Sequence, residues 1–259
     1  FVERSPQGSI YAKTAYLELM GYPFRVLVVR QKGGGIKGGL VEVRNRLGMR
    51  TNPLFVKYLG VLHSGEEGNR HRLRSLAHEV EDLLIEASAT TGVWSYSFHP
   101  AYRNWLGFHW RGYRQTGRYT YRLAFSDGDF RRGYDEALRR QIRAAGKKGL
   151  RVAEAGTGAV AELSVKAFTS RGKRPPYTHA WLEHRVQRLL DAGMLYMRGV
   201  YGGDDRLLAS GALLYDAGSA NLILNGMERE GAAGPANALL VDHFLEFASS
   251  RCEVFDFEG

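Results

Sequence analysis

A short stretch near the C-terminal end of the chain combines the residue types that bind phosphate groups. Arg229 is followed by Gly231 and Gly234, and Pro235 stands where a helix can begin. Small residues let main-chain N–H groups approach a phosphate closely, and a helix N-terminus attracts anions. Glu228 would repel an anion if it faced this turn. The stretch therefore predicts either a phosphate-binding turn or a helix start of small residues without a ligand.

The basic stretch 171–179 could hold the second substrate of a transfer reaction. Arg171 and Arg174 could each bind a phosphate or carboxylate through paired hydrogen bonds, and Tyr177 follows two prolines. Histidine is the side-chain type that titrates near neutral pH, so His179 is a candidate general base for an attacking ammonium group. The alternative is a solvated basic loop that contains a histidine.

Two carboxylates alternate with aromatic residues at the end of the chain. Asp256 and Glu258 are separated by Phe257 and follow Phe255. In a strand, this spacing puts both carboxylates on one face. Asp256 could act as a base and Glu258 could bind an acceptor amine. The alternative is the polar side of a half-buried strand.

The composition is that of a globular protein with a preference for anionic partners. The chain has 259 residues, of which 44% are hydrophobic and 24% charged, and its net charge is +9. Such a charge favours a phosphorylated cofactor, an RNA or another anionic partner. It also fits a simple solubility effect.

Several classes of protein are not expected. Cys252 is the only cysteine, so a reducing, cytoplasmic compartment is the simplest expectation. No run approaches the roughly 18–20 apolar residues of a membrane span. His71 and His78 lack the cysteine pairs or His-Glu-x-x-His spacing of a metal site, so we expect no metal.

The pattern of the second half predicts a mixed sheet with flanking helices. Its expected order is strand, helix, helix, three strands, helix, strand, at 151–154, 159–170, 180–192, 194–201, 207–215, 221–225, 236–250 and 253–257. Three strands joined by short turns favour antiparallel pairing, and the last strand–helix–strand crossover favours a parallel pair. The first half shows a looser version of this order.

An arginine-rich segment between the halves resembles the linking segment of the FemAB-like branch of the GNAT acyltransferase superfamily. The family segment has the form R-x-x-I-R-x-A-x-K-x-G-hydrophobic-x-V, and Arg139, Ile142, Arg143 and Gly149 match it. The Phe-Asp-Phe-Glu-Gly ending at 255–259 also resembles the family. The nearest subgroup is that of the BioF2-like, or CelD-type, acetyltransferase domain proteins.

This resemblance implies an α+β fold of two tandem GNAT-like domains, with mixed, mainly antiparallel sheets flanked by helices. The expected N-terminal domain is 1–125, the linking arginine-rich helix 126–149 and the C-terminal domain 150–259. Relatives continue past this last residue with a strand hairpin, so the chain is expected to be a fragment.

The implied activity is N-acyl transfer from an activated donor to a primary amine of a cell-envelope or polysaccharide-related acceptor. For an acyl-CoA donor, the resemblance implies that the donor is held by Asn225, Gly226, Arg229, Gly231 and Gly234. The main-chain N–H groups of 221–226 would stabilise the tetrahedral intermediate. Arg171, Arg174, Tyr177 and Glu258 would bind the acceptor.

Two other functions stay open. A FemAB-type enzyme would take an aminoacyl-tRNA as donor and act on a peptidoglycan precursor, which the linking segment and the positive charge favour. A non-catalytic module that binds an anion or an RNA would need no catalytic side chains, and the sequence contains no strong catalytic constellation.

Overall fold

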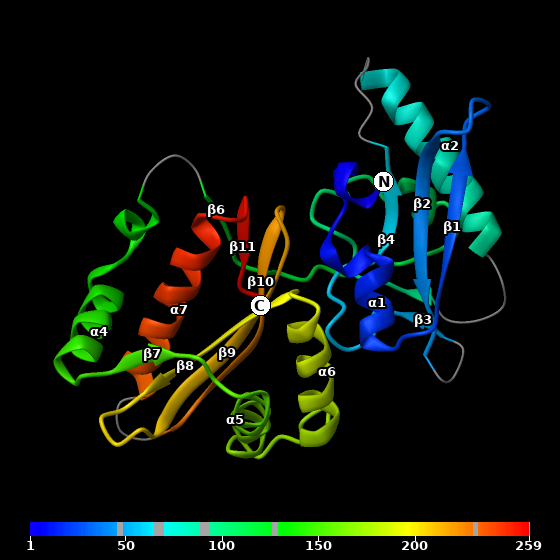
Figure 1. The fold of residues 1–259 in the computed structure, drawn as a ribbon. Helices are drawn as coiled ribbons and strands as arrows, with labels where there is room; N and C mark the ends of the chain where they lie inside the picture. Colours follow the sequence, from blue (N-terminus) through cyan, green and yellow to red (C-terminus); the bar gives the residue numbers. More distant parts are fainter. Residues whose placement is uncertain (46–48, 65–69, 89–93, 126–128, 230–232, 259) are drawn as a thin grey trace. The chain divides into compact units, whose positions relative to one another are not determined.

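The computed structural model describes residues 1–45, 49–64, 70–88, 94–125, 129–229 and 233–258. The chain divides into two compact units, Phe1–Arg118 and Tyr119–Gly259 (Figure 1). The division therefore falls before the expected boundary at residue 125. The reason is that strand β6 (Arg122–Ala124) pairs with strand β11 (Val254–Asp256) of the second unit.

The first unit is built around a three-stranded antiparallel sheet in the order β1-β2-β4. The sheet consists of β1 (Phe24–Arg30), β2 (Ile36–Val43) and β4 (Gly60–His63). Helix α2 (Arg70–Ser88) packs against all three strands. The core joins the sheet to α2 through Leu40, Val61, Val80, Leu84, Ile85 and Phe108.

The remaining elements of the first unit are short. They are two 3-10 helices, Val2–Arg4 and Ile10–Ala12, helix α1 (Thr14–Met20), the parallel pair β3 (Arg50–Thr51) and β5 (Trp94–Ser95), and helix α3 (Leu106–His109). Gly21 ends α1 with a φ of 67°, in the left-handed region that favours glycine.

The second unit contains a six-stranded sheet in the order β6-β11-β10-β9-β8-β7. Its other strands are β7 (Arg151–Ala153), β8 (Leu195–Tyr201), β9 (Leu207–Tyr215) and β10 (Ser219–Met227). All neighbouring strands are antiparallel except β10 and β11, which are parallel. This confirms the expected mixed, mainly antiparallel sheet and the expected crossover.

The described part of the second unit contains four α-helices, three of which contact this sheet directly. The four helices are α4 (Glu136–Lys147), α5 (Thr157–Thr169), α6 (His179–Asp191) and α7 (Ala233–Ser249), and the 3-10 helix Phe130–Gly133 precedes α4. The arginine-rich helix α4, expected as a separate link, packs against α7 within this unit.

Helices α5 and α7 cover opposite faces of the sheet. A side chain at Gly226 would meet the backbone of Leu163 in α5, whereas one at Gly211 would meet Phe244 in α7. Gly211 lies opposite Asn225 in the β9–β10 register, and directly opposed residues share a face. Neighbouring residues 225 and 226 of β10 therefore point to different helices.

The core of the second unit lies between the sheet and α7. It includes Val200, Leu213, Ala220, Leu240, Phe244 and Phe255, all fully or almost fully buried. Local capping fixes where helices begin: Asp135 accepts a hydrogen bond from the Leu138 N–H at the start of α4, and Thr178 accepts one from Trp181 at the start of α6. The described residues include no helix long and apolar enough to cross a membrane.

Candidate functional site

The two parallel strands of the second unit separate soon after they meet. β11 pairs with Ser219, Ala220 and Asn221 of β10. From Leu222 to Met227, β10 pairs with β9 on one side and, within the described residues, with no strand on the other. Alternate main-chain N–H groups along an open strand edge point outward. The edge of β10 can therefore donate hydrogen bonds to a ligand.

The pairing of β11 with β10 ends at Asp256, and the next residue bonds to the β6 side of the sheet. The Phe257 N–H donates to the Tyr121 carbonyl at 3.0 Å, on the β6 side of the sheet. Glu258 then adopts a left-handed backbone conformation with a φ of 53°. The space beside the end of β10 is consequently not filled by the described continuation of β11.

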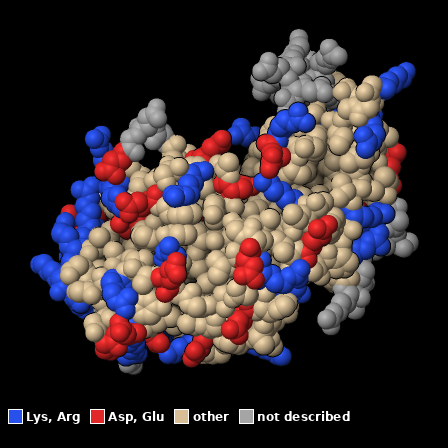
Figure 2. Space-filling model, in the orientation of Figure 1, with Lys and Arg blue, Asp and Glu red and all other residues tan. Residues whose placement is uncertain are grey.

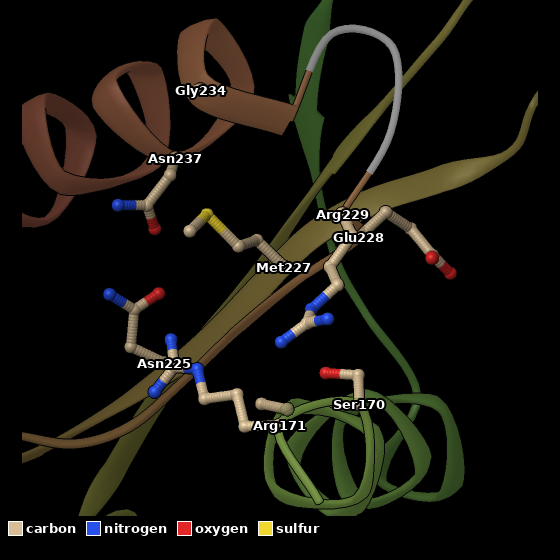
Figure 3. A pocket seen from close by; sticks show the side chains of 9 residues that line it. Ser170, Arg171, Asn225, Met227, Glu228, Arg229, Gly234 and Asn237 are labelled. Atoms are coloured by element: carbon tan, nitrogen blue, oxygen red, sulfur yellow. The ribbon is translucent and has the colours of Figure 1, made fainter.

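A hollow of about 300 Å³ lies at this end of β10, between α5 and α7 (Figure 3). Its walls come from the C-terminal end of α5, the last residues of β10 and the N-terminal turns of α7. The lining residues are Ala167, Ser170, Arg171, Asn225, Met227, Glu228, Arg229, Gly234 and Asn237. The structure thus brings together four of the residues that the sequence singled out: Arg171, Asn225, Arg229 and Gly234.

The charges around the hollow favour an anion. Arg171 and Arg229 are both exposed, and Gly234 leaves open space at the start of α7. Glu228, which could repel an anion, is 15% exposed and accepts hydrogen bonds from Lys166 Nζ at 2.7 and 2.8 Å. Its negative charge is therefore compensated within the protein.

Two carboxamides face each other across the hollow. Figure 3 shows Asn225, from β10, and Asn237, from α7, with their side chains directed toward one another. The Oδ1 atom of Asn237 is buried and accepts no hydrogen bond from the described residues. A buried acceptor without a partner is costly. A ligand with an N–H group would satisfy it.

The expected donor-binding glycine Gly226 differs from Gly234 in its surroundings. Gly226 is buried, and an added Cβ would lie 2.9 Å from the carbonyl carbon and oxygen of Leu163. Its small size therefore serves the close packing of α5 on β10. Gly231 lies outside the described residues.

His179, the candidate general base, lies at the other end of α5 from the hollow. Its Nε2 is 3.1 Å from the Gly158 carbonyl, and its Nδ1 is 3.6 Å from Glu183. Ala167, which lines the hollow, follows Gly158 by nine positions, and this corresponds to roughly 13 Å of helix. In this arrangement His179 does not reach the hollow.

The other two predicted residues of the basic stretch, Tyr177 and Arg174, do not line the hollow. Tyr177 packs edge-on against Phe168 of α5, with ring centroids 5.9 Å apart, and stacks on Trp181 of α6 at 6.5 Å. Burial raises the pKa of Tyr177 to about 12. Arg174 is exposed and does not line the hollow.

Asp256 and Glu258 do not form the expected two-carboxylate strand face, because β11 ends at Asp256. Asp256 is 1% exposed and accepts hydrogen bonds from the Thr120 hydroxyl at 2.6 Å and from the Glu258 N–H at 2.9 Å. Arg122 Nε lies 3.6 Å from its second oxygen. These contacts tie the end of β11 to β6.

Several lining residues were not predicted from the sequence, including Ser170, Met227 and Asn237. Asn237 offered a usable signal, since it is the one amide between apolar residues in the first turns of α7. The pairing of Lys166 with Glu228 offered none, because 62 residues separate them. No cluster of three or more histidine, cysteine or acidic residues able to hold a metal occurs among the described residues.

Comparison with protein-family models and with curated proteins found no match. Comparison with solved structures found clear similarity of fold. The crystal structure of FemX matches with a TM-score of 0.70 and 12% sequence identity, covering 100% of this chain and 85% of that chain.

Two other solved structures share the fold less closely. The C-terminal domain of a putative lysylphosphatidylglycerol synthetase from Agrobacterium fabrum matches with a TM-score of 0.53 and 13% identity, covering 99% of this chain and 77% of that chain. L-PGS from Bacillus licheniformis matches with a TM-score of 0.50 and 11% identity, over 99% and 75%. At these identities the likeness shows the fold alone, and the chain therefore has a FemX-like α+β fold, in agreement with the fold class that the sequence resemblance implied.

Proposed function

We propose that the second unit is an acyltransferase domain that binds an activated, anionic acyl donor in the hollow at the end of β10. One observation carries this proposal: the open edge of β10 runs directly into a hollow with two exposed arginines and the start of α7. A donor could thus place its phosphates at Arg171 and Arg229 and its carbonyl beside the main chain of β10.

The chemistry requires placement more than reactive side chains. The nitrogen of an uncharged primary amine attacks the thioester carbonyl, and the oxygen takes up negative charge. Outward N–H groups of β10 would stabilise that charge. The C–S bond then breaks, and the departing thiolate takes up, through water, the proton that the nitrogen loses. Orientation of the two substrates can supply roughly 7–11 kcal/mol of the barrier reduction.

Coenzyme A is the favoured donor because the hollow fits its two principal features. Its diphosphate matches the paired arginines and the helix start. Its pantetheine amides match the carboxamides of Asn225 and Asn237, including the buried acceptor of Asn237. The proposed acceptor is a primary amine of a cell-envelope or polysaccharide-related molecule, as the sequence resemblance implies.

Binding of acetyl-CoA tests this assignment. The full chain should be stabilised against thermal unfolding by acetyl-CoA, and Arg229→Ala should weaken binding about tenfold, the effect of losing one charge-assisted hydrogen bond. Arg140→Ala removes an exposed arginine of α4 outside this hollow and is the matched control. Equal losses in both variants, or no response to acetyl-CoA, would contradict a coenzyme A site.

An aminoacyl-tRNA is the second candidate donor. The exposed basic residues of α4 and the net charge of +9 favour it. Binding of a tRNA should then weaken steeply with salt, by several powers of ten between 50 and 200 mM for about 6–10 phosphate contacts. Salt-independent binding, or none, would exclude this donor and leave the coenzyme A assignment to its own test.

A further inference from the structure

A second hollow in the second unit lies between α7, α4 and the segment that precedes α4. Its volume is about 410 Å³, and four arginines, two aspartates, a tyrosine and an isoleucine line it. Four positive and two negative side chains give the lining a net charge of +2. Figure 2 shows Lys and Arg side chains gathered along the edge of this unit where α4 lies in Figure 1. None of these lining residues belongs to the hollow at β10.

One aspartate that lines this hollow, Asp242, already forms an ion pair and hydrogen bonds within the protein. Asp242 of α7 accepts hydrogen bonds from Arg131 Nε at 2.8 Å, from Arg131 Nη2 at 3.1 Å and from the Tyr134 hydroxyl at 2.9 Å. A bidentate guanidinium–carboxylate contact is among the stronger ion pairs. Asp242 therefore does not neutralise the other three arginines.

Two of the remaining arginines belong to α4, and Arg132 belongs to the 3-10 helix that precedes α4. Arg139 and Arg143 are four residues apart, so they lie on one helix face with Cβ atoms about 5–6 Å apart. Arg139 Nη2 donates to the Arg132 carbonyl at 3.1 Å, which uses one of its five N–H groups. Arg143 also pairs with the exposed Glu136. In the described part of the chain, no acidic side chain pairs with Arg132 or Arg139.

We propose that this hollow binds a small phosphorylated molecule through Arg132, Arg139 and Arg143. Guanidinium groups match phosphate oxygens through paired, planar hydrogen bonds, which lysine cannot make. All cations that line the hollow are arginines. Ile142 lies between Arg139 and Arg143 and gives the organic part of the ligand an apolar contact. The hollow is within the usual range of roughly 300–1,000 Å³ for small-molecule sites.

The δ1 methyl group of Ile142 offers a local probe of this site. The chain contains five isoleucines, so a spectrum of isoleucine methyl groups is simple to assign. We would titrate the full-length Arg229→Ala protein, in which the hollow at β10 is weakened, with inorganic pyrophosphate, with ADP and with sodium chloride at matched ionic strength. Pyrophosphate tests recognition of the diphosphate alone, and a lower Kd for ADP than for pyrophosphate would identify a nucleotide as its source.

The expected result is a saturable shift of the Ile142 signal with pyrophosphate and with ADP, and none with sodium chloride. Adding Arg139→Gln and Arg143→Gln should weaken pyrophosphate binding about tenfold or more. The matched control, Arg140→Gln with Lys147→Gln, removes the same charge from the same helix outside the hollow and should leave the affinity within about twofold.

Three results would overturn the proposal. The first is no saturable shift with pyrophosphate. The second is an equal loss in both double variants, since general screening by the helix charge would then explain it. The third is an equal shift of the Ile142 signal with sodium chloride at matched ionic strength, because a general salt effect would then explain the response. The outcome does not depend on whether acetyl-CoA binds at β10.

Discussion

Lys166 Nζ lies 2.7 and 2.8 Å from the two carboxylate oxygens of Glu228, across the wall of the hollow at β10. Lys166 comes from α5, and Glu228 follows directly after β10. The pair therefore joins the two elements that frame the hollow and cancels the charge that would oppose a phosphate. Arg206 adds a weaker contact at 4.0 Å.

Removal of Lys166 should weaken acyl-CoA binding without removing a ligand contact. In Lys166→Met, the carboxylate of Glu228 would face the hollow with only the weaker Arg206 contact to offset its charge. Repulsion of about 1–2 kcal/mol corresponds to a roughly 5- to 30-fold increase in the Kd for acetyl-CoA. Isothermal titration calorimetry would measure this change.

The double variant Lys166→Met/Glu228→Gln is the matched control for this charge effect. Without the carboxylate, affinity should return to within about threefold of the wild-type protein. If the double variant binds as poorly as Lys166→Met, Lys166 contacts the ligand itself and the compensation argument fails.

Gly226 and Gly234 differ in how closely the protein packs around them, so their Ala variants should differ in stability. In Gly226→Ala the new Cβ would lie 2.9 Å from the Leu163 backbone, so unfolding free energy should fall by about 1–3 kcal/mol in urea titrations. In Gly234→Ala no atom lies within 4 Å of the new Cβ, so stability should not fall. Equal stability of both variants would show that α5 can shift without cost.

His179 should be dispensable for turnover. Its ring contacts Gly158 at the start of α5, whereas the hollow is at the other end of that helix. His179→Gln should therefore keep kcat and KM within about twofold across pH 6 to 9. A selective fall of kcat, with loss of an acid limb in the pH profile, would show that His179 is the base after all.

Much of the second unit could be predicted because its pattern is local. Three strands joined by short turns and an apolar helix before the last strand are visible in the sequence. The order of β7 to β11 and the parallel β10–β11 pair were predicted on this basis and are confirmed. The boundary between the two units was not predicted correctly, because β6 pairs with β11, which follows more than a hundred residues later in the chain.

The hollow was only partly predictable, for a similar reason. Arg229 and Gly234 follow a local pattern, so their position at the start of α7 was foreseen. The direction of the side chains at the end of the last strand was not foreseen. Alternation suggested that Asp256 and Glu258 share a face, but β11 ends at Asp256 and Glu258 adopts a left-handed backbone conformation. Such endings depend on tertiary contacts that no short window contains.

Asp256 should prove to be a structural residue. It is 1% exposed and holds Thr120 and Arg122, so Asp256→Asn should lower the unfolding free energy by about 1–3 kcal/mol. At a temperature where the variant is folded, kcat should change less than about threefold. A loss of kcat above about a hundredfold with unchanged stability would instead identify Asp256 as the general base.

His243 should make stability depend on pH. Its Nε2 lies 2.8 Å from the Tyr196 hydroxyl, on the face of the sheet covered by α7. Burial lowers the pKa of His243, Arg198 acts in the same direction, and the carboxylates of Asp242 and Glu246 oppose the shift.

Because the folded protein binds this proton less readily than the unfolded chain, the unfolded state gains protons first as pH falls. Unfolding free energy should therefore decline below about pH 6.5, the usual histidine value, until pH passes the lowered pKa of the folded state. His243→Gln should reduce this decline, measured by urea titrations from pH 8 to pH 5. His184→Gln, at an exposed histidine of α6, should leave it unchanged. If both variants decline as steeply as the wild-type protein, His243 is not the group responsible.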